Sequence, residues 1–192
     1  MKRWQIFTIA CISMFLTGCI SNVWTGVNLA YDRHNIYKKV SDFKLSANVN
    51  RIIYHNKRLQ QDDCSIDTAV FNGDVLLVGY VPSRILRDEA TQKIAALPGV
   101  RRLFNQIDVT RLPEDTPLED SVITATIRSQ IFSDSSIDPH SFKVVTSGQI
   151  VYLMGDVIPE QANHVIRFAR TSYGVKRVVK LFKYYNLSDK PQ

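Results

Sequence analysis

The chain has 192 residues, of which 24 are basic and 18 acidic, giving a formal net charge of +6. Two of the basic residues, Lys2 and Arg3, belong to a segment that we expect to be removed, which leaves 22 basic residues against 18 acidic ones. The remaining net charge of +4 is too small to indicate a nucleic-acid-binding protein by itself.

The N-terminus has the parts of a secretory signal peptide. A positively charged start precedes an uncharged apolar stretch over residues 6–16, which is too short to span a bilayer. Leu16-Thr17-Gly18-Cys19 then resembles a bacterial lipobox. The resemblance implies that a signal peptide at residues 1–18 is removed and that Cys19 is lipidated. Because no aspartate follows Cys19, it also implies anchorage at the periplasmic face of the outer membrane. The alternative is an ordinary signal peptide with an incidental cysteine.

Cys64 is the only thiol expected in the mature chain, because Cys11 leaves with the signal peptide and Cys19 carries lipid. An intramolecular disulfide is therefore excluded. Its place just before a strand-like segment favours a buried, inert thiol, and an intermolecular bridge is the alternative.

Residues 19–42 show no clear periodicity and are expected to be a tether before the first module, which we place at residues 43–110. The strongest signal in this module is Asn72-Gly73 between two apolar runs, because both residues tolerate the positive φ of a hairpin turn. The predicted elements are a helix over Leu45–Leu59, strands over Ser65–Phe71 and Val75–Val81, a helix over Ser83–Leu97 and a strand over Leu103–Val109.

A linker at residues 111–116 leads to the second module, which we place at residues 117–186, before a tail at residues 187–192. Thr116-Pro117-Leu118-Glu119 matches a capping box with proline at the first helical position. The predicted elements are a helix from there to Phe132, strands over Phe142–Thr146 and Ile150–Val157, a helix over Pro159–Tyr173 and a strand over Arg177–Tyr185.

The two modules repeat one pattern at an offset of about 75 residues. In each, two glycines flank an apolar strand, and a Gly-Val pair follows the next helix. The repeat predicts an α/β fold, an α+β sandwich in which each module is helix–strand–strand–helix–strand with a three-stranded mixed sheet. Gly174 is expected to cap a helix with positive φ. The glycines given structural roles are Gly79, Gly99, Gly155 and Gly174.

This pattern resembles the BON domain, most closely through Val151–Gly155 and Gly174–Val178 of the second module. Two such modules behind a lipobox resemble the dual-BON outer-membrane lipoproteins of the DolP type, over residues 43–186. The resemblance implies a second module that binds anionic phospholipid through its leading helix. The family tends to have an aromatic residue near the start of that helix, where this chain has Val122.

The leading helix of the second module has two apolar faces. Ile123, Ile127 and Ile131 share one face and form the better core stripe. Leu118, Val122, Ala125 and Phe132 share nearly the opposite face. We expect Leu118, Val122 and Phe132 to insert into lipid. The alternative is that this face packs against the first module or belongs to a thick core.

Basic residues between Gln161 and Asn186 occur without any acid, and they can attract anionic headgroups or an acidic protein. The alternative is a solvated surface with an accidental charge bias. On the second helix Tyr173 is expected in the buried arc. Phe168 lies outside this arc and is expected to pack against the other module, with an exposed anchor as the alternative. The basic lipid-binding candidates are Arg167, Arg170 and Lys176.

No residue pattern indicates catalysis: there is no His-x-x-x-His pair, phosphate loop or Gly-x-Ser-x-Gly, and the acidic pairs are adjacent in sequence. The sequence therefore predicts a non-enzymatic protein without metal or cofactor. With the resemblance, it is expected to bind an anionic phospholipid membrane and support outer-membrane integrity. The alternatives are a periplasmic scaffold that docks an outer-membrane assembly or secretion component, and a peptidoglycan or envelope-stress factor without lipid affinity.

Overall fold

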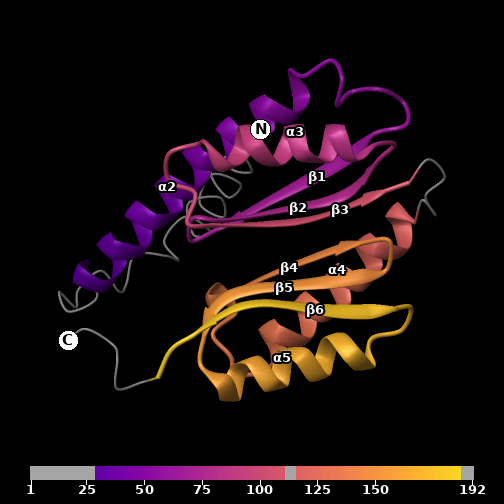
Figure 1. Cartoon of the computed structure of the whole chain (residues 1–192). Coiled ribbons are helices and arrows are strands. Elements are labelled where there is room, and N and C mark those ends of the chain that lie inside the picture. The colour runs from indigo at the N-terminus through magenta and orange to yellow at the C-terminus, as the bar shows by residue number, and fades with distance from the viewer. Residues whose placement is uncertain (1–28, 111–115, 187–192) are drawn as a thin grey trace, which may run out of the picture. The chain divides into compact units, whose positions relative to one another are not determined.

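The structure is a computed structural model that describes residues 29–110 and 116–186, with side chains in the first helix from Tyr37 onward. The predicted signal peptide, Cys19 and the C-terminal tail lie outside these residues. Within them, no helix is both long enough and apolar enough to cross a membrane. The first module consists of helix α2 (Leu29–Tyr54), strands β1 (Ser65–Phe71) and β2 (Asp74–Val81), helix α3 (Arg84–Ala95) and strand β3 (Arg102–Val109) (Figure 1).

The second module repeats this order. It consists of helix α4 (Pro117–Ser133), the short 3-10 helix η1 (Pro139–Ser141), strands β4 (Phe142–Ser147) and β5 (Ile150–Val157), helix α5 (Pro159–Thr171) and strand β6 (Arg177–Tyr184). In each sheet the first two strands are antiparallel and the second and third are parallel, so β2 and β5 are central. The prediction of two three-stranded mixed sheets, each with two helices, is confirmed.

Three helices differ from the prediction by two residues or more, and of these α3 ends at Ala95 instead of Leu97. Helix α2 begins at Leu29, inside the segment expected to be only a tether, and ends at Tyr54 instead of Leu59. Helix α5 ends at Thr171, so Tyr173 lies beyond it and is 99% exposed, which makes its assignment to the buried arc wrong. The physical reason is that the backbone turns away at Ser172, whose ψ of 134° is extended.

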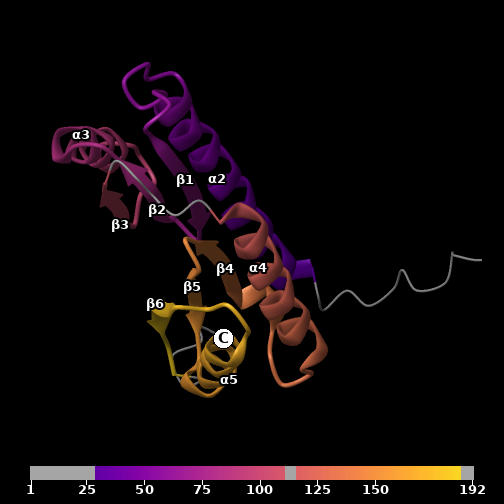
Figure 2. The ribbon, with the colours of Figure 1, turned by 90° about the vertical axis from the view of Figure 1, so that its right-hand side faces the viewer.

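Helices cover only one face of each sheet, α2 and α3 on the first and α4 and α5 on the second (Figures 1 and 2). The core beneath them is apolar and almost fully buried. In the first module it includes Leu45, Val49 and Ile53 of α2. In the second it includes Ile123, Ile127 and Ile131 of α4, as predicted from their spacing.

An aspartate begins the buried stripe of each leading helix. The carboxylate of Asp42 accepts the backbone N–H groups of Asn72 and Gly73, at 2.6 and 2.9 Å. The carboxylate of Asp120 accepts those of Gly148 and Gln149, at 2.8 and 2.7 Å. Each aspartate thus fixes its helix to the hairpin turn of its own sheet. The repeated stripes are Asp42, Leu45, Val49 and Ile53 in α2, and Asp120, Ile123, Ile127 and Ile131 in α4, in each case 78 residues apart.

The other faces of the two sheets form a further apolar cluster. Leu76 and Val78 of β2 are in it, with Tyr152 and Met154 of β5. All four side chains are at most 3% exposed, which explains why the central strands are apolar at consecutive positions. The modules therefore meet through their sheets, and the outer face of α4 is not needed for this contact.

Charged side chains at the hairpin end link the two modules. Asp74, 1% exposed, accepts hydrogen bonds from the guanidinium groups of Arg101 and Arg102. Arg101 also donates to Asp156 of β5, with Nη2 2.7 Å from Oδ1. Burial acts to raise the pKa of Asp74, but the hydrogen bonds from Arg101 and Arg102 outweigh it, so the pKa is lowered from its ordinary value.

A lowered folded-state pKa means that the Asp74 carboxylate stabilises the fold above its unfolded pKa, near 4, and that this stability is lost as the pH falls through the folded value. Asp74→Asn removes the charge at every pH. We expect it to cost about 2–3 kcal/mol at pH 7, below the loss for a fully buried pair because both arginines keep part of their exposure. Thermal melts across pH test this: the difference from the parent protein should shrink below pH 4, and a constant difference would contradict it.

The repeated glycines meet different steric demands. Gly79, Gly99 and Gly174 have φ of 114°, 91° and 83°, in the left-handed region. Gly155 does not have a positive φ, but a Cβ there would lie 2.5 Å from the Ser141 carbonyl oxygen. It is therefore required for close approach to the backbone before β4.

Candidate lipid-binding surface

The outer face of α4 is exposed over the length of the helix. Leu118, Val122 and Phe132 are 79%, 65% and 62% exposed, whereas Ile127 on the opposite face is fully buried. The alternative that this face packs against the first module does not hold, because each of these three side chains keeps more than half of its surface exposed. A helix needs one apolar face for its core, so the second apolar face is free to contact something else.

The start of α4 differs from the predicted capping box. The Thr116 hydroxyl makes no capping hydrogen bond, and its oxygen is buried without a hydrogen-bond partner. Pro117 occupies the first turn as predicted. The Asp120 carboxylate fixes this end of the helix, because it accepts hydrogen bonds from the backbone of the hairpin turn between β4 and β5. The helix is thus fixed by the sheet it covers, and its orientation follows from the core and not from a local cap.

Phe132, at the end of α4, borders a hollow of about 340 Å³. Its lining also includes Arg128, one turn earlier on the helix, and His140 and Lys143 beyond it. Neither Arg128 nor Lys143 forms an ion pair with a residue that the structure describes. Sequence analysis missed these cations, although the spacing of four between Arg128 and Phe132 places them on neighbouring turns of one helix side. An exposed phenyl ring beside unpaired cations suits the boundary between acyl chains and anionic headgroups.

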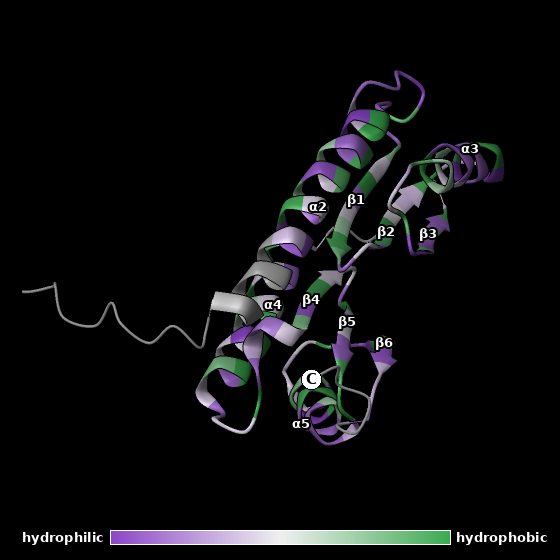
Figure 3. Cartoon of the chain, turned by 90° about the vertical axis from the view of Figure 1, so that its left-hand side faces the viewer, coloured by the Kyte–Doolittle hydropathy of each residue, from purple (hydrophilic) through white to green (hydrophobic). Residues whose placement is uncertain are grey.

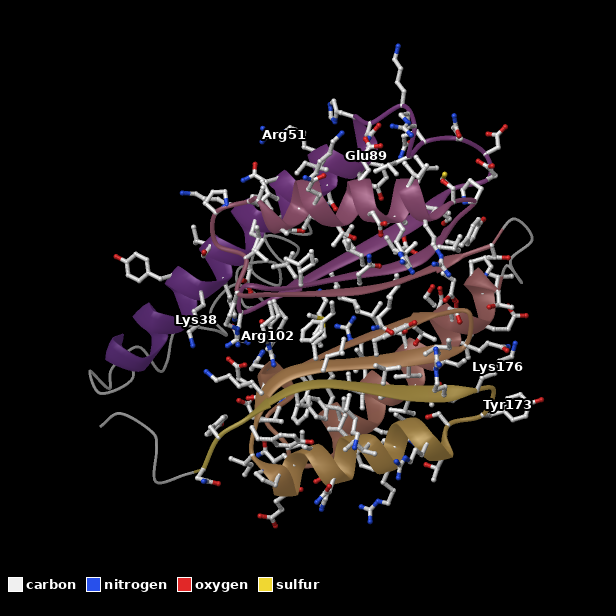
Figure 4. The ribbon with its side chains drawn as sticks, viewed as in Figure 1. Lys38, Arg51, Glu89, Arg102, Tyr173 and Lys176 are labelled. Carbon is white, nitrogen blue, oxygen red and sulfur yellow. The ribbon has the colours of Figure 1, made fainter. Side chains whose placement is uncertain are left out.

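The three predicted basic residues lie elsewhere in the module. Arg167 and Arg170 are exposed on α5, and the Arg167 guanidinium lies 6.0 Å from the ring centre of Phe168. Phe168 packs against the core of its own module, so the expectation that it packs against the other module is wrong. Lys176 is exposed in the loop before β6, near Tyr173 (Figure 4). Arg167 and Arg170 thus belong to α5 and Lys176 to the loop before β6, and none of the three belongs to α4.

Cys64 is partly buried and packs at the edge of the first core. Burial and the neighbouring Asp63 carboxylate raise the pKa of its thiol, which lowers the fraction of reactive thiolate. A cleft of about 1020 Å³ lies between the modules, and its lining includes Asp67, Asp108 and Asp120. In residues 29–110 and 116–186, no three histidine, cysteine or acidic side chains are grouped as metal ligands.

Comparison with known proteins supports the internal repeat. The family model described as "BON domain" matches residues 41–111 and again residues 119–186. The chain is 28% identical over 177 residues to "Outer membrane lipoprotein DolP" of Haemophilus influenzae, with 90% of this chain and 91% of that protein covered. It is 29% identical to "21 kDa hemolysin" of Actinobacillus pleuropneumoniae, with 70% and 71% covered.

Among solved structures, the chain is similar to the C-terminal domain of CdsD, a structural protein of the type III secretion system of Chlamydia trachomatis. The two are 12% identical, and the match covers 75% of this chain and 98% of that domain with a TM-score of 0.31.

Proposed function

This chain belongs to the BON-domain family, and on that basis we propose that it is a lipid-anchored, non-enzymatic protein of the periplasmic face of the outer membrane. In this proposal Cys19 carries the lipid, and the second module binds anionic phospholipid through the outer face of α4. Binding would direct the anchored protein to particular membrane regions and support outer-membrane integrity. The similarity to an outer membrane lipoprotein along nine tenths of the chain supports the location.

The observation that carries the proposal is the second apolar face of α4. Leu118, Val122 and Phe132 are exposed on a helix whose other face already fills the core. Each Å² of apolar surface that such side chains bury in a membrane contributes about 25 cal/mol to the free energy of membrane binding. Arg128 and Lys143 beside Phe132 supply charge for anionic headgroups, each worth about 1 kcal/mol near such a surface. Arg167, Arg170 and Lys176 would add attraction over a longer range.

Flotation of residues 20–192 without the acyl chains tests lipid recognition apart from the anchor. We expect binding to vesicles that contain phosphatidylglycerol and little binding to phosphatidylcholine alone. Replacing Arg167, Arg170 and Lys176 by glutamate should weaken binding at low salt and have less effect at high salt, because exposed charges are screened within about 10 Å at 0.1 M. Equal absence of binding to both vesicles would favour the scaffold that docks an outer-membrane assembly or secretion component.

The anchor is tested separately by Cys19→Ala. No described helix can span a membrane, so we expect loss of the acyl chains to leave an unlipidated protein that is soluble or uncleaved. Metabolic labelling with a fatty-acid analogue measures this directly. Label that persists in the Cys19→Ala protein would contradict lipidation at this residue.

A further inference from the structure

Helix α2 of the first module also has an exposed second face. Tyr37, Val40, Phe43 and Tyr54 are 75%, 47%, 76% and 57% exposed. At about 100° per residue they lie away from the buried stripe that begins at Leu45. Figure 3 shows hydrophobic residues alternating with hydrophilic ones along both α2 and α4. Large apolar side chains on the solvent side of a helix that already has a core face are unexplained by the fold.

The outer faces of α2 and α4 correspond at three positions of the repeat. The same separation of 78 residues that aligns the two buried stripes also aligns three apolar outer positions. The aligned outer pairs are Val40 with Leu118, Ala47 with Ala125, and Tyr54 with Phe132. Both copies of the repeat thus keep apolar side chains on a face that neither core uses. This indicates that the two outer faces bind the same kind of surface.

The outer face of α2 is more basic than that of α4. Lys44 and Arg51 stand where α4 has Val122 and Ser129, and Lys38 and Lys39 precede them. From Tyr37 to Tyr54 the only acid is Asp42, whose carboxylate is turned inward to the hairpin turn. None of the four cations forms an ion pair with a described residue; Figure 4 shows Lys38 and Arg51 on the helix. Apolar side chains flanked by unpaired cations match an anionic membrane surface.

The N-terminal end of α2 is also close in sequence to Cys19, the proposed lipid anchor. Leu29, the first residue of α2, comes ten positions after Cys19, a distance of at most about 35 Å for an extended chain. From Tyr37 to Lys44 the described side chains are exposed except for the half-buried Asp42, so this part of the helix has little tertiary packing. Unpacked helix is only marginally stable in water, and contact with a surface would stabilise it.

We infer that the outer face of α2, formed by Tyr37, Val40, Phe43, Lys44 and Tyr54, is a second site that binds the anionic phospholipid surface. The inference rests on the proposed lipid anchor but not on the proposed role of α4. The first module would then be a membrane-contacting unit in its own right and not only a support for the second. Two sites on one anchored chain bind with a high effective concentration, because the first contact holds the second near its target.

The test uses the full-length lipoprotein reconstituted into vesicles, with Cys64→Ser to leave one reactive cysteine. An environment-sensitive fluorophore is attached at Ala47→Cys in α2, at the matched Ala125→Cys in α4, or at the exposed Gln92→Cys in α3 as the control. In phosphatidylglycerol-containing vesicles we expect the emission at position 47 to shift to shorter wavelength and to become protected from an aqueous quencher. Neither change is expected at position 92 or in phosphatidylcholine alone.

A double substitution tests whether the fluorescence response at position 47 depends on the outer face of α2. Val40→Ser with Phe43→Ser should abolish the response at position 47 and leave the melting temperature unchanged, because both side chains are exposed. A response at position 125 without one at 47 would overturn this inference and leave the proposed function standing. A response at 47 without one at 125 would support it and contradict the role of α4. A response at 47 that survives the double serine variant would also overturn it.

Discussion

Gly79→Ala is expected to unfold the first module or destabilise it by about 3 kcal/mol or more. Gly79 lies in β2 opposite Ile66 of β1, and its φ of 114° is one that residues with a side chain rarely adopt. A Cβ at this position would also overlap the carbonyl oxygen of Ser65, which belongs to the backbone and cannot rotate away. Thermal melting followed by circular dichroism measures the loss.

Gly99→Ala is the matched control for this substitution. Gly99 has a similar φ of 91°, but no atom lies within 4 Å of the position its Cβ would take. Gly99→Ala should therefore lower the free energy of unfolding by backbone strain alone, about 1–2 kcal/mol. If the two variants melted at the same temperature, close approach of β1 at Gly79 would not be the reason for the glycine.

Ile127→Glu is expected to unfold the second module, whereas Val122→Glu on the same helix should leave it folded. Ile127 is fully buried in the core, and a carboxylate there would have no partner, at a cost of about 4 kcal/mol or more. Val122 is 65% exposed, so a charge at that position stays in water. Circular dichroism melts of both variants check the assignment of the two faces. A folded Ile127→Glu protein beside an unfolded Val122→Glu protein would show that the faces are inverted.

Local patterns in the sequence were sufficient to predict most of the fold. Apolar runs bounded by turn pairs and glycines predicted all six strands to within one residue at each end. The helical spacing of three isoleucines predicted the buried face of α4. The first helix was predicted less well. Residues 29–44 of α2 have no buried apolar stripe in the described part, so periodicity gave no signal there.

Contacts between distant segments explain what the sequence did not reveal. Asp120 follows Glu119 directly in the sequence, and such an acidic pair does not by itself indicate hydrogen bonds to the hairpin turn. Its place three residues before Ile123 on the buried face, like that of Asp42 before Leu45, was the usable signal. The sheet-to-sheet contact had a usable signal, namely consecutive apolar residues from Val75 to Val78 in β2, a pattern typical of strands buried on both faces. The spacing of four within α4 was a usable signal for Arg128 beside Phe132. The position of Lys143 beside the same ring depends on how β4 is placed against α4, which no local pattern encodes.

The most direct test of the central claim is flotation of residues 20–192 carrying Leu118→Glu and Val122→Glu with phosphatidylglycerol-containing vesicles, beside the parent protein and a circular dichroism melt. We expect the variant to melt like the parent, because both side chains are exposed, and to lose most of its vesicle binding at low and high salt alike. A folded variant that still binds the vesicles as the parent does would show that the outer face of α4 is not the lipid site.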